Sequence, residues 1–361
     1  MTRVLYVTAD ERRETFLRTE VDALRALGND VRVESLRRLM NDPRAYGSPW
    51  LSARTLSRLG RARGSLPGKA WPKTALAAVL AGSIARRNED WQPDHVHAYW
   101  ASGPASAGWL VAHELGVPFS LSAHRGDIYA NELLAPKLRA AAFARAISDR
   151  AAVLLRNVAG DARVEVVRVG VALPGDGPRP AGERFLAVGD LYPVKGHADL
   201  LRAMERIDAR LDVVGAGPLE RALRRQVAAS TALTERVRLL GRLPHDDVLA
   251  LMRDARALVH PSVMRANGVE EGVPVTVLEA GARRLPVIAT LSGATGELLD
   301  DDVARVVPSG DPVALAGALH AVVDEPKNAE RRANALYDRI AASWDVRVTA
   351  ARMAALFAGG E

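Results

Sequence analysis

Two glutamates eight residues apart, Glu271 and Glu279, form the clearest chemical pattern in this chain. Gly272 and Pro274 between them mark a turn and a typical first helical residue, so we expect a helix that begins near Val275. The first turn of a helix presents backbone N–H groups that attract an anion. Carboxylates on either side could bind hydroxyl groups, which matches the ribose, diphosphate and hexose of a nucleotide-activated sugar. Two acids that only stabilise a helix dipole are the simpler alternative.

Two further residues follow expected strands. Lys195 precedes Gly196 in the loop after residues 185–188, and a lysine beside exposed backbone suits a phosphate group. His124 follows the apolar run at residues 118–122, where a histidine can bond a substrate hydroxyl. On position alone, a surface lysine and a loop histidine bonded to backbone remain the alternatives.

Two patterns that resemble ligand sites are explained more simply. The glycine turn at residues 211–219 has Glu220 where a third glycine would stand, so we expect no nicotinamide cofactor. Asp246 and Asp247 follow Pro244 at a helix start, and residues 300–302 lie in an expected turn. We interpret these acids as caps and solvated turns, and we expect no metal site.

The bulk properties indicate a soluble protein with two domains. A chain of 361 residues is too long for one typical core and suits two domains. Its hydrophobic content of 48% is ordinary for a soluble globular protein. It contains no cysteine, which excludes disulfides and thiolate metal sites. We find no signal peptide and no apolar run that could span a bilayer, so we expect a cytoplasmic protein.

The net charge of +6 is unevenly distributed. Residues 36–87 contain eleven lysines and arginines but one acid, Asp42, with Trp50, Leu56 and Trp71 among the interleaved apolar residues. Such a stretch could contact an anionic membrane surface or face an acidic acceptor, and a solvated helical face is the alternative. We find no recognised nucleic-acid-binding motif and expect no nucleic-acid partner.

Strand and helix patterns alternate in two passes, separated by a Pro- and Gly-rich linker at residues 173–182. The first pass has expected strands at 4–7, 31–34, 95–97, 118–122 and 164–169, and the second at 185–188, 211–214, 237–239, 257–259 and 287–290. This alternation predicts an α/β protein with two doubly wound parallel sheets. We expect the two halves to face each other across a cleft, with ligands beyond the carboxyl ends of the strands.

Together these segments resemble a retaining glycosyltransferase of the GT-B fold, family 4. The C-terminal motifs that carry the resemblance are Val188-Gly-Asp-Leu with Lys195-Gly, Val214-Gly-Ala-Gly-Pro, Leu240-Gly-Arg-Leu, His260-Pro-Ser, Glu271-Gly-Val-Pro with Leu-Glu279-Ala, and Leu285-Pro-Val-Ile-Ala-Thr. Glu14-Thr-Phe, His97-Ala-Tyr-Trp and Ala123-His124-Arg-Gly-Asp are similar to the branch that builds exopolysaccharides and colanic-acid-like repeat units. Sugar transferases of secondary metabolism share the fold.

The resemblance implies a domain plan and an activity. Residues 1–174 would bind the acceptor, residues 175–341 the nucleotide-sugar donor, and residues 342–361 would form a helix that returns to the first domain. The reaction would be metal-independent and need no cofactor. It would move a sugar from UDP or GDP to a saccharide, a lipid-linked saccharide or a small molecule. The alternatives are a sugar-nucleotide epimerase, a phosphorylase, or a non-catalytic membrane-associated protein of the same fold.

The resemblance also implies a role for each site residue. Glu271 would bind the donor sugar, together with the backbone of Gly272, Val273, Pro274 and Val275, and Glu279 would bind the ribose. Lys195, beside Gly189, and the amides near Thr276 and Val277 would bind the diphosphate. The backbone of Arg242 and Leu243 would recognise the base, and His124 would lie beside the anomeric carbon and the acceptor.

The chain departs from the family pattern at two positions near this site. Asp190 stands where the family usually carries an arginine, and an acid there repels a phosphate unless it points away. Arg284 replaces a customary glycine before Leu285-Pro, where it supplies charge or only occupies a tolerant turn.

Overall fold

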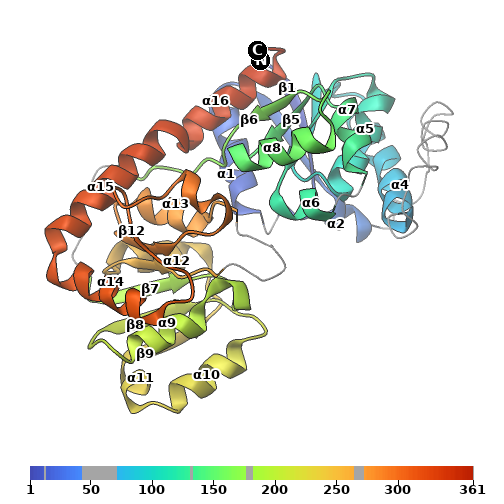
Figure 1. Cartoon of the computed structure of the whole chain (residues 1–361). Coiled ribbons are helices and arrows are strands. Elements are labelled where there is room, and N and C mark those ends of the chain that lie inside the picture. Colours follow the sequence, from blue (N-terminus) through green and yellow to red (C-terminus); the bar gives the residue numbers. More distant parts are fainter. Residues whose placement is uncertain (12–13, 43–70, 131–132, 176–181, 264–271, 361) are drawn as a thin grey trace. The chain divides into compact units, whose positions relative to one another are not determined.

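The computed structural model describes residues 1–11, 14–42, 71–130, 133–175, 182–263 and 272–360 (Figure 1). The chain divides into two compact units, one of residues 1–170 with 346–361 and the other of residues 171–345. The sequence places these boundaries at 174/175 and 341/342. Glu271 lies outside the described residues.

In the described part of the first unit, six parallel strands form one sheet in the order β2-β1-β3-β4-β5-β6. The strands are β1 (Arg3–Thr8), β2 (Asp30–Ser35), β3 (His95–Ala98), β4 (Phe119–Ala123), β5 (Phe143–Ala146) and β6 (Val164–Val166). The helices are α1 (Thr15–Ala26), α2 (Leu36–Met40), α4 (Trp71–Arg87), α5 (Gly103–Leu115), α6 (Arg125–Ala130), α7 (Leu134–Ala140), α8 (Asp149–Val158) and α16 (Val346–Phe357).

Strand β1 shows why this sheet is covered on both faces. Its residues from Val4 to Val7 are apolar and fully buried, which is typical of a central parallel strand. Leu5 and Val7 pack with residues of α4 and α5, whereas Val4 and Tyr6 pack with residues of α1 and α16. The period-two alternation of side chains therefore divides the core between two helical layers (Figure 1).

The described part of the second unit repeats this plan with six parallel strands in the order β12-β11-β10-β7-β8-β9. The strands are β7 (Arg184–Val188), β8 (Arg210–Val214), β9 (Val237–Gly241), β10 (Leu258–His260), β11 (Val287–Thr290) and β12 (Arg305–Val307). The helices are η3 (Pro193–Lys195), α9 (His197–Met204), α10 (Glu220–Ala228), α11 (Thr231–Arg236), α12 (His245–Asp254), α13 (Val275–Gly281), η4 (Gly293–Glu297), α14 (Pro312–Asp324) and α15 (Pro326–Ser343).

Helix α16 belongs to the first unit although it ends the described chain. Its residues Met353, Leu356 and Phe357 are buried in one core cluster with β1 and α1. The Phe357 ring meets the Tyr6 ring edge to face, with 6.0 Å between centroids. The last helix is therefore part of the first unit's core.

Each sheet has a topological switch point beside its first strand. The strands that follow β1 lie on both sides of it, β2 on one side and β3 on the other, and β7 likewise lies between β8 and β10. In open parallel sheets, ligands bind at the carboxyl ends of the strands at such a point. The predicted α/β, doubly wound architecture is confirmed, and it directs attention to the loops after β1, β3, β7 and β10.

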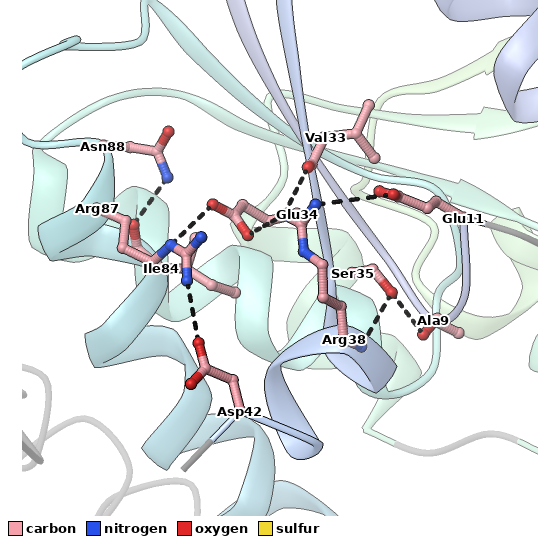
Figure 2. Close-up of polar contacts among 10 residues, drawn as sticks. All are labelled: Ala9, Glu11, Val33, Glu34, Ser35, Arg38, Asp42, Ile84, Arg87 and Asn88. Atoms are coloured by element: carbon pink, nitrogen blue, oxygen red, sulfur yellow. Dashed lines mark hydrogen bonds and ion pairs between the residues drawn. The ribbon is translucent and has the colours of Figure 1, made fainter. Parts of the chain in front are cut away.

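Some arginines of the basic stretch are used inside the first unit. Figure 2 shows buried Glu34, at the end of β2, between Arg38 of α2 at 2.9 Å and Arg87 of α4 at 3.4 Å. Arg87 also lies 3.7 Å from Asp42. These ion pairs join α2 to α4 and neutralise part of the positive charge locally. Six of the eleven cations lie at residues 43–70, outside the described residues.

Within the parts of the chain that the structure describes, no helix has both the length and the apolar character needed to cross a membrane.

Candidate functional site

Lys195 lies at the switch point of the second unit. It ends η3, in the loop that follows β7. Its aliphatic stem passes over Gly189, where an added Cβ would lie 3.6 Å from Lys195 Cδ. The lysine stem thus lies against the backbone after β7, which places its cationic group at this edge of the sheet, an arrangement suited to an anion.

The loops after β7, β8 and β10 approach each other through glycines. Gly196 has a φ of +67°, and an added Cβ would lie 1.8 Å from the carbonyl oxygen of Pro261, after β10. Gly215, after β8, would place a Cβ 1.9 Å from the carbonyl oxygen of Gly189. These glycines permit close contact between backbones. The Gly-Ala-Gly turn after β8 therefore packs against the loop that carries Asp190.

Two buried histidines adjoin this lysine. His197 begins α9 and His260 ends β10. Burial, together with the nearby His260 and Lys195, lowers the pKa of His197 to about 4. His197 is therefore neutral at physiological pH, and Lys195 provides the positive charge of this loop.

Helix α13 begins at Val275 after Pro274, as the sequence predicts. Gly272, Val273, Val275 and Thr276 are half-buried before and within its first turn, and Pro274 and Val277 are buried. Glu279 is buried one turn inside the helix, and its Oε1 lies 2.5 Å from Nε2 of His245, the first residue of α12. Sequence analysis missed His245, which lies 34 residues from its partner.

Asp190 forms an ion pair that the sequence did not reveal. Its Oδ1 lies 2.8 Å from Nη2 of Arg242, which follows β9, and both side chains are exposed. The charge of Asp190, which the sequence left unpartnered, is therefore neutralised by a neighbouring cation. Leu243, next in the chain, is half-buried.

Of the two alternatives for Arg284, a charge supplied to the site or a turn that accepts a residue other than glycine, the structure shows the turn. Its φ is +53°, in the left-handed region where a glycine costs least. Its guanidinium lies 3.6 Å from the centre of the Tyr337 ring and donates to Asn334, both on α15. Arg284 thus lies beyond the C-terminal end of α13, at the opposite end of the helix from the expected anion.

His124 lies in the first unit, directly after β4. Its ring centroid is 4.1 Å from that of Trp100 and 5.2 Å from that of Tyr99, two residues that follow β3. Burial, and then the charge of Arg145, lower the pKa of His124 to about 3. The imidazole is therefore neutral, with Nδ1 3.8 Å from a carboxylate oxygen of Asp127.

A buried lysine shapes the loop beside His124. Nζ of Lys137 donates to the carbonyl oxygens of Ala101 and Ser102, at 2.6 and 3.0 Å. The side chain of Asp127 accepts a hydrogen bond from the backbone N–H of His124 at 3.2 Å. These contacts fix the backbone after β3 and β4, and they orient the aromatic residues around His124.

The structure therefore groups the predicted residues by unit. Lys195 with Gly189, Glu279 with the first turn of α13, and Arg242 with Asp190 all belong to the second unit, and His124 belongs to the first. Two surface hollows, lined in part by Trp109 and Phe119 or by Pro286 and Arg305, lie at the amino ends of the strands instead. Among the described residues, no group of three or more histidines and acids is placed to hold a metal ion.

Comparison with known proteins adds a family likeness to this geometry. Residues 182–325 match the family described as glycosyl transferases group 1. A D-inositol 3-phosphate glycosyltransferase of Salinispora tropica is 31% identical over 310 residues, which are 72% of this chain and 62% of that protein. WcaL of Escherichia coli K12, assigned to colanic acid biosynthesis as a glycosyltransferase, is 32% identical over 170 residues, 44% of this chain and 42% of that protein.

The fold likeness extends over nearly the whole chain. The crystal structure of Alr3699/HepE of Anabaena in complex with UDP and glucose aligns with a TM-score of 0.73 at 15% identity, over 99% of this chain and 100% of that chain. This likeness establishes the GT-B fold. The alignments with the two sequence relatives span less than two thirds of the relatives' own lengths.

Proposed function

We propose that this protein is a glycosyltransferase that moves a sugar from a nucleoside diphosphate to a hydroxyl group of an acceptor. The observation that carries the proposal is the site at the β7/β10 switch point. There the stem of Lys195 lies against the backbone of Gly189, in loops that glycines allow to pack closely. The group 1 match covers these residues, and HepE, with the same fold, is described in complex with UDP.

The second unit would bind the donor. Lys195 stabilises the charge on the departing diphosphate, together with the amides of Thr276 and Val277 at the start of α13. Glu279 binds the ribose, and the backbone of Arg242 and Leu243 contacts the base. Glu271, with the backbone from Gly272 to Val275, binds hydroxyls of the transferred sugar. Each preorganised donor to the leaving group contributes on the order of 3 kcal/mol to transition-state stabilisation.

The first unit would bind the acceptor, a saccharide, a lipid-linked saccharide or a small molecule. The neutral His124 contributes a hydrogen-bonding group at the carboxyl edge of its sheet. The reaction would be metal-independent and retain the anomeric configuration, as the resemblance to family 4 implies. The likeness to WcaL supports a role in exopolysaccharide assembly.

A donor panel tests this proposal. UDP- and GDP-sugars are scored for nucleotide release, with and without neutral hexosides and extracted glycolipid. We expect release to depend on the acceptor and to fall at least about a hundredfold in Lys195→Ala and in Glu271→Ala. Acceptor-independent conversion of the sugar would indicate an epimerase, and dependence on inorganic phosphate a phosphorylase. Absence of UDP and GDP binding by isothermal titration would favour a non-catalytic protein.

We also propose that the protein is cytoplasmic and contacts anionic membranes through its basic stretch. Since Arg38 and Arg87 are paired with Glu34, the charge available to lipid headgroups must come mainly from residues 44–69. Flotation of the full chain with phosphatidylglycerol vesicles should show binding that falls with salt. Equal recovery with neutral vesicles, or none with either, would reject this contact.

A further inference from the structure

Glu14 bridges the switch point of the first sheet. It stands just before α1, in the connection that follows β1, while Trp100 follows β3. Oε1 of Glu14 accepts a hydrogen bond from Nε1 of Trp100 at 2.8 Å, and Oε2 accepts one from the hydroxyl of Thr8. The carboxylate thus joins the ends of the two strands between which this fold binds ligands.

The contacts of Glu14 are unusual for a structural acid. It is the N-cap residue of α1, yet its side chain makes no capping hydrogen bond. Its hydrogen-bond donors, Thr8, Trp100 and the backbone N–H of Asp10, are all neutral. Among the described residues, no lysine or arginine pairs with it, and burial raises its pKa above the ordinary value. A carboxylate oxygen has two acceptor sites, so Oε2 can still accept a hydroxyl.

The row of groups continues from Trp100 to His124. Their ring centroids are 4.1 Å apart, and the imidazole is neutral. A carboxylate, a half-buried indole and an uncharged imidazole therefore stand side by side at the ends of β1, β3 and β4. The carboxylate accepts hydroxyl protons, and the aromatic face packs against C–H groups, which suits a neutral polyhydroxylated ring. Among the described side chains of this set there is no cation that would pair with a phosphate.

We propose that Glu14, Trp100 and His124 form the subsite for a neutral sugar ring of the acceptor, in which Glu14 accepts a hydrogen bond from a sugar hydroxyl. This inference rests on the proposed glycosyltransferase function and names its acceptor class. It makes Glu14 and Trp100 acceptor-binding residues, a role that differs from helix capping or fold stability.

The test compares Glu14→Gln with Glu11→Gln, which removes a charge from the same loop without touching Trp100. Neutral methyl hexosides serve as probes in saturation-transfer NMR and as acceptors with the accepted donor. We expect Glu14→Gln to raise the acceptor KM about tenfold and weaken the NMR transfer, with the donor KM and UDP or GDP binding unchanged. Glu11→Gln should behave as the parent protein.

Trp100→Phe provides a second variant that keeps a ring but removes the N–H donor. It should also raise the acceptor KM while nucleotide binding is retained. An unchanged acceptor KM in Glu14→Gln, no binding of any neutral hexoside, or a preference for hexose phosphates would overturn the inference. If the parent protein bound neither UDP nor GDP, the proposed function itself would be rejected. The failure of the acceptor subsite and the failure of the proposed function are therefore distinguishable.

Discussion

The two sheets differ in strand order, but each has a switch point beside its first strand, and the carboxyl edges at these points differ in chemistry. Beside β7, Gly196 and Gly215 let the loop backbones pack closely, and Lys195 adds its charge. Beside β1, the corresponding edge presents side chains, Glu14 and Trp100, with a neutral imidazole next to them. Under the proposed function, the switch points would determine where ligands bind, whereas the loop residues would determine which ligand: an anion at the second edge and hydroxyl groups at the first.

Glycine use accounts for much of this difference. At Gly196 and Gly215 an added Cβ would lie less than 2 Å from a carbonyl oxygen, so the second edge is built from backbone contacts. The first edge instead relies on a buried lysine, Lys137, to bind carbonyl oxygens after β3. Backbone amides can bind a phosphate group whatever that phosphate is attached to. Side chains can distinguish ligands by the arrangement of their hydroxyl groups.

The largest effect is expected from Lys195→Ala. If the second edge stabilises a leaving diphosphate, kcat should fall about 10²- to 10³-fold while the acceptor KM changes little. The measurement is steady-state kinetics with the accepted donor. Lys327→Ala, an exposed lysine of α15, is the control and should leave the rate unchanged. Near-normal turnover in Lys195→Ala would show that the second edge does not stabilise the leaving group through this lysine, and would contradict the contrast between the two edges.

A smaller effect is expected from His245→Ala, because this histidine holds Glu279 at 2.5 Å. A freed carboxylate should bind the ribose less well, and the donor KM should rise about tenfold with little change in kcat. His245→Gln retains an N–H donor and should recover part of the affinity. Asp246→Ala, an exposed neighbour on α12, is the control. A change in acceptor KM instead would contradict the assignment of Glu279 to the donor edge.

Acid should destabilise the first unit more than the second. Burial lowers the pKa of His95 to about 4, that of His97 well below its ordinary value and that of His124 to about 3. The unfolded chain binds protons at the ordinary pKa of 6.5, so stability is present above pH 6.5 and declines as the pH falls towards 4. Each such histidine can contribute up to about 1.4 kcal/mol per pH unit.

Urea unfolding at pH 7, 6 and 5 measures this decline. His95→Gln should reduce the slope of unfolding free energy against pH, and His320→Gln, an exposed histidine of α14, should not. Equal slopes for all three proteins would show that the buried histidines do not set the acid sensitivity.

The smallest effect is expected from the pair of Asp190 and Arg242. Exposed ion pairs contribute about 0.2–1 kcal/mol, so Asp190→Asn should alter stability little. Because it removes an acid near the proposed diphosphate, it should lower the donor KM two- to threefold, by roughly the energy of such a pair. Arg242→Ala should raise it, and both effects should shrink at high salt. Asp208→Asn, a fully exposed acid paired with Arg236, is the control.

The sheets were predictable because their strands are continuous apolar runs. Val4–Val7 and residues 287–290 were expected as strands and are observed within β1 and as β11. Pro274 predicted the start of α13 to within one residue: it was expected as the first helical residue and is observed as the extended N-cap residue before Val275. Strand β12, Arg305–Val307, was missed, although the equally short β6 and β10 overlap expected strands.

The site was predictable only where a local motif carries it. Lys195 and Glu279 stand next to glycines or a helix start that mark their loops. The pairing of Glu279 with His245 joins residues 34 apart in sequence, and that of Glu14 with Trp100 joins residues 86 apart. Such contacts depend on which loops the topology brings to one edge, and local propensity holds no information about them.

Helix α16 has a consequence for the order of events during synthesis. Met353, Leu356 and Phe357 complete a core cluster with Val4 and Tyr6, at the other end of the first unit's sequence. Domains generally fold in the order in which they leave the ribosome. Here the second unit can bury its own core before α16 has been synthesised, whereas the core of the first unit is still incomplete at that stage. A chain that is stopped after residue 345 would therefore release a folded second unit attached to a first unit with an exposed apolar face.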